Sequence, residues 1–476
     1  MSSRAANDIA SFDGLRARAR ACALSVVCGA LALSLALPGT PAFADVKKSD
    51  IVYGSTVEAL GLTVADCPDI DASYAIVMDS DGVVFFERSV DSDSQIASVT
   101  KVMTAIVALE NGVSTDKITV SAKAAEIGES SANLEEGDVL DLNAALLALM
   151  VPSGNDAAQS LCEFYGAKIL AARGETGDSE DAEEAFVQAM NDTAAKIGMT
   201  NTVFTNPHGL DDGEYADDLH STARDVAKMI AYAMAKPEFR QLVNQETASI
   251  TVEREGAAET IELESTDELL GVLEGACGVK TGYTDLAGAC FAGAVNRNGS
   301  DLYTVVLGAS DELQRFTDTE TLAEWYYEHM IDYPLVNSSQ TVTSSISGAA
   351  GQVPLIATVA HRDYVDKTVN ATFADTSQTI RVFDLHGNVT QKLEERDLTG
   401  DVHAGDVVGQ VVFYQHNEEV ARVDLIAAED VAAPNPLEAI GTAVDRFIRG
   451  ITGQQTVAAS TLVNKSLLIN DKTSSY

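Results

Sequence analysis

Positive charge is scarce in this 476-residue chain. Lysine and arginine together number 31, against 72 aspartate and glutamate residues, and the formal net charge is −41. A surface of this sign repels the phosphates of nucleic acid and the anionic lipids of a membrane. The composition therefore argues against nucleic acid as a partner, and we interpret the many carboxylates as a well-solvated surface.

Residues that hold metals or cofactors are few or poorly spaced. The seven histidines show no zinc-ligand spacing, and no glycine-rich phosphate loop occurs. We therefore expect no metal and no cofactor. The chain has six cysteines, and those beyond the N-terminal region are too few for a disulfide scaffold: Cys67, Cys162, Cys277 and Cys290. Stability must therefore come mainly from hydrophobic cores.

Long apolar runs are missing except near the N-terminus. A basic start precedes an apolar run from Ala21 to Leu37, and Ala42-Phe43-Ala44 then gives the small-x-small pattern that a signal peptidase accepts. We predict a signal peptide over residues 1–44. The protein is then exported, to the cell wall or the outer face of the cytoplasmic membrane. The alternative is a retained anchor, because the run is just long enough for a short span.

Residues 45–335 carry strand and helix signals in the order expected of one mixed domain. Strands are expected on both sides of a turn at 79–82, and a β-meander over 277–307. Apolar residues recur at helical spacing between and after these strands. The expected helices cover 98–109, 142–150, a long stretch to about 197 that an acidic loop at 174–183 interrupts, 222–234, and 322–330. This order favours an α/β fold with one antiparallel sheet flanked by helices.

The character of the chain changes after about Val336. A polar stretch over 337–347 is expected to be a linker. Residues 353–427 alternate at period two, which predicts a small C-terminal all-β domain over 348–430. Residues 435–476 are expected to form an amphipathic helix, with its apolar stripe from Leu437 to Ile451, and then a polar, mobile tail from Gly453.

Three short motifs occur in order along the first domain. The first, Ser98-Val99-Thr100-Lys101, places a hydroxyl and an amine one turn apart on one helix face. A serine hydroxyl is a weak nucleophile, and a lysine kept neutral by burial and nearby positive charge can serve as its base. A serine at the start of a helix also lies where backbone N–H groups point toward the reaction.

The second motif is Ser153-Gly154-Asn155, in the loop after a predicted helix. The Ser153 hydroxyl can relay a proton between the lysine and a leaving amine. The Asn155 amide can bind both the lysine and a substrate carbonyl. The motif therefore supplies the polar groups that a Ser/Lys pair needs beside it.

The third motif, Lys280-Thr281-Gly282, lies on a predicted strand whose edge can pair with an extended peptide. Lys280 and Thr281 can bind a carboxylate, and Gly282 leaves room for a substrate to approach the backbone. We expect the N–H groups of Tyr283 and Ser98 to form an oxyanion hole.

Each motif alone is weak evidence. Ser114-Thr115-Asp116-Lys117 and Ser131-Ala132-Asn133 fit the same patterns, but they lie in polar, loop-like surroundings. On the plainest interpretation Ser98 is a helix cap, Ser153 a turn residue and Lys280 an exposed strand lysine. The ordered combination of helix, loop and strand contexts favours an active site instead.

The sequence around these motifs resembles the low-molecular-mass penicillin-binding proteins of the D-alanyl-D-alanine carboxypeptidase family. The matching stretches lie within residues 70–335, at 97–104, 152–158, 204–210, 221–225 and 278–284. The resemblance implies a serine β-lactamase/DD-peptidase-like catalytic domain. It also implies a serine-type hydrolase that removes the last D-alanine from peptidoglycan pentapeptides ending in D-Ala-D-Ala, and that β-lactams acylate.

The resemblance also implies roles for single residues. Ser98 is the acylated nucleophile, Lys101 its general base, and Ser153 and Asn155 complete the proton relay. Substrate binding falls to Lys280, Thr281, Gly282, Tyr283 and Arg315. Arg315 lies where the family often has a carboxylate-binding arginine, and an exposed arginine is the alternative. His208 and Asp225 are interpreted as structural loop residues.

Three further questions stay open at the level of sequence. The amphipathic C-terminal helix holds related enzymes on the membrane, but its charges cancel here, and packing against the β domain is the alternative. Cys277 and Cys290 flank the hairpin turn, either as a disulfide or as two buried thiols. A β-lactamase, or a catalytically weak wall-binding protein, is the alternative to the carboxypeptidase.

Overall fold

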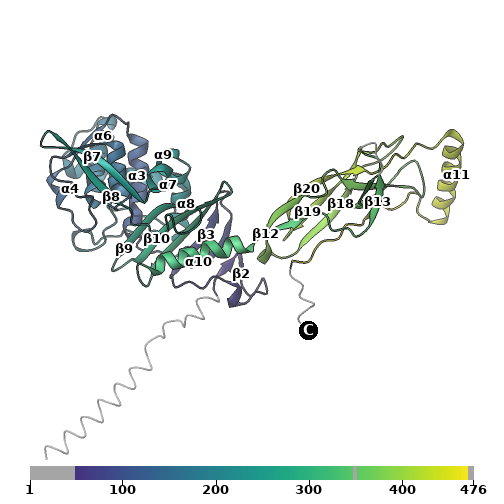
Figure 1. Ribbon diagram of the computed structural model, residues 1–476, viewed down its shortest axis with the longest axis horizontal. Helices are drawn as coiled ribbons and strands as arrows, with labels where there is room; N and C mark the ends of the chain where they lie inside the picture. The colour runs from purple at the N-terminus through teal and green to yellow at the C-terminus, as the bar shows by residue number, and fades with distance from the viewer. Residues whose placement is uncertain (1–48, 347–350, 470–476) are drawn as a thin grey trace, which may run out of the picture. The chain divides into compact units, whose positions relative to one another are not determined.

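The computed structural model describes residues 49–346 and 351–469, so the predicted signal peptide lies outside the described residues. A seven-stranded antiparallel sheet, in the order β2-β1-β4-β3-β11-β10-β9, is the centre of the region that carries the three motifs (Figure 1). Its strands are β1 Ile51–Val52, β2 Ser55–Thr56, β3 Tyr74–Asp79, β4 Val84–Arg88, β9 Ala276–Thr284, β10 Gly288–Arg297 and β11 Ser300–Ala309.

Short turns with specific side-chain chemistry connect neighbouring strands of this sheet. Between β3 and β4, Asp79 Oδ1 accepts hydrogen bonds from the N–H groups of Asp81 and Val83, both at 2.9 Å. Between β10 and β11, Asn298 and Gly299 both have positive φ, 56° and 81°. This pair fits the two-residue turn that matches the twist of a hairpin.

The two faces of the sheet belong to two different cores. Along β11, Val305 and Leu307 face one cluster, whereas Leu302 and Val306 face the other, because successive side chains of a strand point to opposite faces. Helix α8 (Ala223–Met234) packs on the first face, and α10 (Gln314–His329) contributes to the second cluster. Figure 1 shows α10 running along the sheet.

A group of helices completes the first core. Helix α3 lies at its centre and is buried from Lys101 through Ala108, so that even its polar side chains are inside. The helices of the group are α3 Lys101–Asn111, α4 Ala122–Glu126, α5 Leu142–Met150, α6 Asn155–Arg173, α7 Ser179–Ile197 and α9 Pro237–Val243. Before Met330, the described residues also form short 3₁₀ helices at η1 Val64–Asp66, η2 Ala97–Thr100 and η3 Gly213–Tyr215.

A four-stranded sheet beside the helices was not predicted. Its order is β5-β6-β7-β8, with β5 Lys117–Thr119, β6 Val139–Asp141, β7 Thr247–Arg254 and β8 Ala257–Glu264. Helix α10 also begins at Gln314 rather than at 322. The side chain of Asp311 accepts from the N–H groups of Leu313 (3.0 Å) and Gln314 (2.9 Å), which begins the helix early.

The C-terminal part is built of strands around its own core, so the predicted fold class, a mixed α/β domain followed by an all-β one, is confirmed. Its six-stranded sheet has the order β18-β19-β20-β16-β15-β21, and two further strand pairs are β12–β17 and β13–β14. The bounds are β12 Met330–Pro334, β13 Thr341–Ser344, β14 Gly351–Pro354, β15 Ala357–Ala360, β16 Thr368–Phe373, β17 Thr379–Phe383, η4 Asp384–His386, β18 Val389–Glu395, β19 Val407–Gln415, β20 Glu418–Ala427 and β21 Thr461–Leu462.

Two expectations for this part are wrong. Part of the predicted linker, Thr341–Ser344, is a strand that pairs with Gly351–Pro354. The tail is attached at residues 461–469, because Thr461–Leu462 pairs with β15 and Asn464 Nδ2 donates to the carbonyl of Leu335 at 2.7 Å. The exact domain boundaries stay a prediction.

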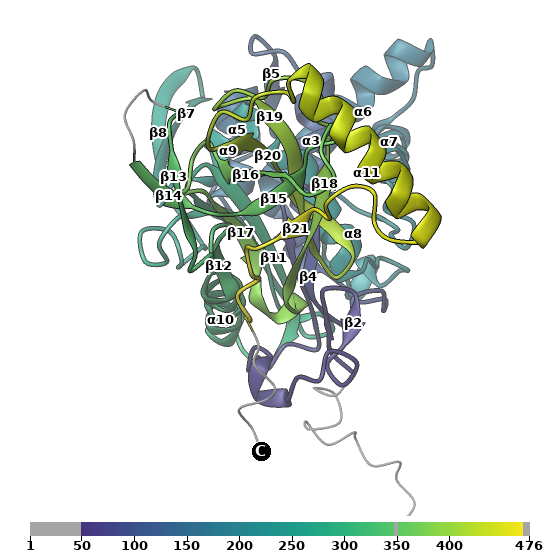
Figure 2. The same ribbon diagram turned by 90° about the vertical axis from the view of Figure 1, so that its right-hand side faces the viewer.

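Helix α11 (Pro436–Thr452) confirms the predicted amphipathic helix. Its apolar stripe is exposed along the whole helix, from 80% at Leu437 to 70% at Ile451. One of the two sequence alternatives required this stripe to pack against the strands of the β domain. The stripe does not do so. Figure 2 shows α11 in yellow beside the C-terminal strands. Within residues 49–346 and 351–469, no helix has both the length and the apolar character needed to cross a membrane.

Candidate active site

Ser98 and Lys101 lie where the 3₁₀ helix η2 continues into α3. The Lys101 Nζ contacts three oxygens: Ser98 Oγ at 2.7 Å, the His208 carbonyl at 3.1 Å and Ser153 Oγ at 3.5 Å. The spacing of three residues therefore does bring hydroxyl and amine together, as predicted. Ser153, from a separate loop, reaches the same amine.

The Lys101 side chain is fully buried, and its surroundings disfavour a charge. Burial is the largest influence that lowers the pKa of Lys101 well below its ordinary value, and the Lys280 charge lowers it further. The Asp156 carboxylate acts in the opposite direction. A neutral amine at 2.7 Å from Ser98 Oγ has a lone pair that can accept the serine proton.

The second motif forms a tight turn between α5 and α6. Ser153 has φ of +66°, a left-handed conformation that is rare for a residue with a side chain. The turn is fixed by backbone bonds, with Gly154 N donating to Ala148 O at 3.1 Å and Asn155 N to Ser130 O at 2.8 Å. Such local strain is typical of positions that the surrounding structure holds for a function.

The Asn155 amide is directed differently from our expectation. Its Nδ2 donates to the carbonyl of Gly128 at 3.0 Å, and within the described residues it makes no hydrogen bond to Lys101. Its Oδ1 is buried and has no hydrogen-bond partner among the described residues. A buried amide oxygen without a partner is costly, so this atom is ready to accept a bond from a bound molecule.

Asp156, which the sequence reasoning missed, holds the loop beside this turn. Its carboxylate accepts from Ser131 Oγ at 2.7 Å and from the N–H groups of Ala132 and Leu134, at 3.0 and 3.1 Å for Oδ2. It also accepts from Ala157 N at 2.8 Å. The segment Ser131-Ala132-Asn133, set aside as a chance match to the second motif, is thus tied to the second motif's turn, and the preceding residues Glu129 and Ser130 line the pocket.

The third motif lies on β9, where Lys280 and Thr281 are both buried. Burial, followed by the Arg315 charge, lowers the pKa of Lys280 to about 7. A Cβ added to Gly282 would lie 2.9 Å from Ile96 O and 3.1 Å from Ser98 N. The strand therefore runs directly against the start of η2, and only glycine permits this approach.

Arg315 is buried, with 5% of its surface exposed, so the alternative of an exposed arginine is wrong. It lies in the first turn of α10 and donates through Nη1 to the carbonyl of Gly282 at 3.1 Å. Its Nη2 pairs with Glu312 at 3.1 Å. Arg315 is thereby fixed beside the third motif.

A second loop supports Lys101 from the other side. Asn206 Oδ1 accepts from His208 N at 3.2 Å and from Gly209 N at 2.7 Å, and this turn directs the His208 carbonyl at the amine. Gly209, with φ of +90°, packs so tightly that an added Cβ would lie 1.9 Å from Ala97 O. Burial lowers the pKa of His208 to about 3, so the ring is neutral.

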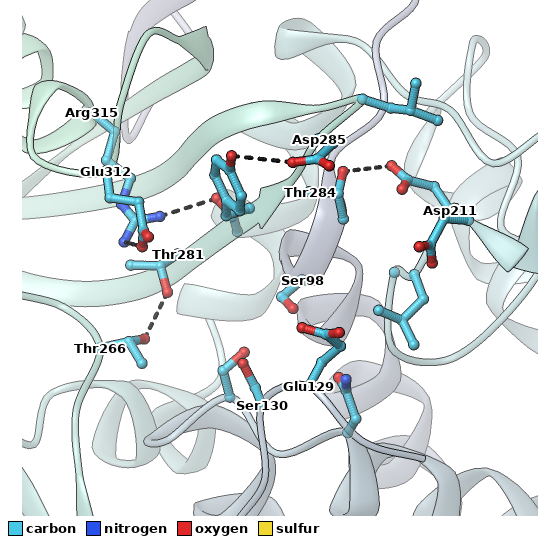
Figure 3. A pocket seen from close by; sticks show the side chains of 18 of the residues that line it. Ser98, Glu129, Ser130, Asp211, Thr266, Thr281, Thr284, Asp285, Glu312 and Arg315 are labelled. Carbon is cyan, nitrogen blue, oxygen red and sulfur yellow. Dashed lines mark hydrogen bonds and ion pairs between the residues drawn. The ribbon is translucent and has the colours of Figure 1, made fainter.

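These elements enclose a pocket of about 540 Å³ (Figure 3). Predicted site residues that line it are Ser98, Ser153, Asn155, Thr281, Gly282, Tyr283 and Arg315. Lys101 and Lys280 lie buried just beneath. The sequence did not point to several other lining residues, among them Glu129, Asp211, Thr266, Glu268 and Asp285. Of these, Asp211 accepts a 2.6 Å bond from Thr284, which joins the His208 loop to the end of β9.

The cysteines are separate from this chemistry. All four in the described residues are buried, and Cys162, Cys277 and Cys290 are free thiols. In the β9–β10 ladder Cys290 pairs with Gly282 and Ala276 with Val295, so Cys277 and Cys290 are offset along the hairpin and do not face each other. The described residues also contain no group of three or more histidine, cysteine, aspartate or glutamate side chains arranged to hold a metal ion.

Comparisons with known proteins agree with this geometry. The sequence profile of a D-alanyl-D-alanine carboxypeptidase family matches residues 62–311, more than half of the chain. The D-alanyl-D-alanine carboxypeptidase DacF of Bacillus subtilis is 26% identical over 373 residues, which is 76% of this chain and 86% of that protein.

Solved structures extend the likeness to three dimensions. A Streptomyces DD-transpeptidase is 28% identical, with a TM-score of 0.51, and the match covers 55% of this chain and 98% of that one. The carboxypeptidase DacD of Francisella tularensis, at 23% identity and a TM-score of 0.52, matches 84% of this chain and all of its own, which indicates a shared fold. The implied DD-peptidase-like fold is confirmed.

Proposed function

The chain belongs to the D-alanyl-D-alanine carboxypeptidase family, and on that premise we propose that Ser98 is its nucleophile in removing the terminal D-alanine from peptidoglycan stem peptides. The observation that carries the proposal is the 2.7 Å contact between Ser98 Oγ and the buried Lys101 amine. A serine without such a base is a weak nucleophile. The remaining site residues are arranged around this pair.

Acylation begins with proton transfer from Ser98 Oγ to the neutral Lys101 amine. The oxygen attacks the carbonyl carbon of the penultimate D-alanine, and the negative charge that develops on the carbonyl oxygen is held by the N–H groups of Ser98 and Tyr283. The close approach of Gly282 to Ser98 N supports this assignment. Ser153 Oγ, 3.5 Å from Lys101 Nζ, relays the proton to the leaving nitrogen.

The released product is free D-alanine, and water then hydrolyses the Ser98 ester to regenerate the serine. During both steps Lys280, Thr281 and Arg315 bind the terminal carboxylate, since they carry the cationic and hydroxyl groups of the pocket. The unpartnered Asn155 Oδ1 accepts from a backbone N–H of the substrate. This role replaces the lysine contact that the sequence suggested for Asn155.

β-Lactams acylate Ser98 by the same route, because their strained amide occupies the place of the D-Ala–D-Ala bond. Membership of the family disfavours the β-lactamase alternative. A wall-binding protein without catalysis is disfavoured by the assembled Ser98–Lys101–Ser153 cluster, which costs burial of a lysine that simple binding does not need.

The decisive experiment compares the chain from residue 45 onwards with its Ser98→Ala variant. We expect the parent to release D-alanine from a Lys-D-Ala-D-Ala peptide and the variant to release none, although both fold. A parent that hydrolyses penicillin rapidly and releases no D-alanine would support the β-lactamase alternative. Equal release by both proteins would remove Ser98 from the mechanism.

The same proposal includes the place of action. We infer an exported protein from the predicted signal peptide, and attachment to an uncharged membrane surface through α11. Its exposed stripe supports attachment, with Phe447 at 70% and Ile440 at 63% exposure. Neither arginine of the polar face is turned toward a membrane, because Arg449 pairs with Asp445 and Arg446 donates to backbone carbonyls of the β domain.

Vesicle flotation tests this attachment. The parent chain should float with zwitterionic vesicles, and Phe447→Glu should abolish flotation without changing D-alanine release. A parent chain that stays at the bottom of the gradient would contradict membrane attachment and leave catalysis unaffected.

A further inference from the structure

A hydroxyl outside the three motifs belongs to the carboxylate end of the pocket. Thr266 lies in the loop between β8 and β9, and its Oγ1 is 2.6 Å from Oγ1 of Thr281. Both threonines line the pocket, and Figure 3 shows their bond on the same side as Arg315. Thr266 is thus the direct neighbour of a hydroxyl that binds substrate in the proposed function.

Four bonds hold this loop in place. The N–H groups of Ser265 and Thr266 donate to Glu246 O at 2.9 Å and to Val151 O at 3.2 Å. Asp267 then closes a local turn, with its own N donating to Ser265 Oγ at 3.1 Å and its Oδ1 accepting from Leu269 N at 2.9 Å. The Thr266 hydroxyl therefore reaches Thr281 from a rigid support.

The same loop connects two motifs. Val151, which accepts from Thr266 N, lies two positions before Ser153, while the Thr266 side chain reaches Thr281 on β9. Thr266 therefore fixes the distance between the turn that carries the proton relay and the strand that carries the carboxylate site. Thr266 makes no other hydrogen bond to the described residues.

The chemistry of hydroxyl groups determines what this contact does. A threonine oxygen has one hydrogen and two lone pairs. The Lys280 amine, at 3.4 Å from Thr281 Oγ1, approaches one lone pair. If Thr266 donates to the other, then the Thr281 hydrogen has only the pocket left to point into. A chain of such bonds also polarises each member and strengthens the last one.

We infer that Thr266 is a positioning residue that aims the Thr281 hydroxyl at the terminal carboxylate of the substrate. The inference rests on the proposed function and adds a specificity element to it: recognition of a free carboxylate rather than of the peptide bond. Thr266 does not take part in proton transfer, because its hydroxyl is bonded to Thr281 and not to the Ser98–Lys101 pair.

The test measures release of the last residue from two substrates that differ at one group: D-alanine from Lys-D-Ala-D-Ala, and D-alaninamide from its C-terminal carboxamide. Thr266→Val removes the hydroxyl at constant shape, and Thr266→Ser restores it. Thr260→Val, on the exposed part of β8, is the matched control. Melting temperatures of all variants check that each one folds.

We expect Thr266→Val to raise KM for the carboxylate substrate roughly tenfold, the scale of one hydrogen bond to a charged group, with kcat little changed. Thr266→Ser and Thr260→Val should match the parent. On the carboxamide, parent and Thr266→Val should be alike. A Thr266→Val, Thr281→Val double variant should be no weaker than Thr281→Val alone, because both substitutions break one unit.

Two results would overturn the inference. One is an unchanged KM in a folded Thr266→Val protein, and the other is an equal loss on both substrates, which would indicate a merely structural role. If the parent itself releases no D-alanine, the proposed function fails. The rate of acylation by benzylpenicillin, which carries its own carboxylate, then replaces D-alanine release, and an unchanged rate or no acylation at all overturns the inference as well.

Discussion

Replacing Gly209 by alanine should disable the site from outside the three motifs. An alanine Cβ at this position would lie 1.9 Å from Ala97 O and 2.9 Å from Thr100 Oγ1. A carbon and an oxygen approach no closer than roughly 3.3 Å in ordinary contacts, so the two segments must separate by roughly 1.4 Å. Residue 97 directly precedes the nucleophile, and residue 208 carries the carbonyl bonded to Lys101.

The magnitude follows from two separate costs. Holding alanine at φ of +90° costs about 1 kcal/mol relative to glycine, and the overlap adds about 1–3 kcal/mol. We therefore expect the free energy of unfolding to fall by about 2–4 kcal/mol, as the sum of these two terms. A displacement near 1 Å at the reacting groups should lower kcat/KM roughly a hundredfold.

Gly198→Ala is the matched control, because Gly198 also has a left-handed φ, +82°, but an added Cβ would meet nothing within 4 Å. This variant should lose about 1 kcal/mol in urea unfolding and keep its D-alanine release. The reasoning would be refuted if the two glycine variants had the same kcat/KM, since the overlap with Ala97 would then have no effect on the reacting groups.

Two further predictions concern charge. Because the pKa of Lys280 is about 7, Lys280 loses its proton as the pH increases through about 7, and KM for a carboxylate-terminated peptide should then rise. KM for the carboxamide should stay constant over the same pH range. Parallel pH profiles of KM for both substrates would contradict this prediction. Asp156→Ala should lower the free energy of unfolding by about 3–5 kcal/mol in urea, because its partners within Ser131–Leu134 lose a buried acceptor, whereas exposed Asp192→Ala should change little. Equal losses for the two aspartates would be the contrary result.

Local signals in the sequence predicted local structure well. The Asn298-Gly299 turn, the amphipathic helix α11 and the pairing of Ser98 with Lys101 each depend on residues a few positions apart. The β7–β8 hairpin had a comparable signal that we missed, the adjacent pair Glu255-Gly256 between two segments that form strands. Both residues have positive φ in the structure. Its exposed glutamates hid the strand pattern, because few of its side chains are apolar.

Long-range contacts set the limits of the site prediction. Thr284 and Asp211 are bonded although 73 positions separate them, and Thr266 meets Thr281 from a loop without any motif. The offset of Cys277 from Cys290 depends on where the hairpin turns, between Thr284 and Gly288, and a shift of a few residues in that turn changes every pairing. Such facts follow from the folded register and not from residue spacing.

The return of the chain after α11 has a mechanical consequence. Helix α11 is attached on one side through β20, which pairs with β19 from Glu418 to Ile426, and on the other through β21, which has two paired residues with β15. A load applied to the helix, by a surface or by a moving cell wall, is thus divided between a strong and a weak attachment. Opening of the short ladder would leave the helix held by the ten-residue β20 and by the bonds of Arg446 to the carbonyls of Arg362 and Tyr364, so the enzyme would stay attached.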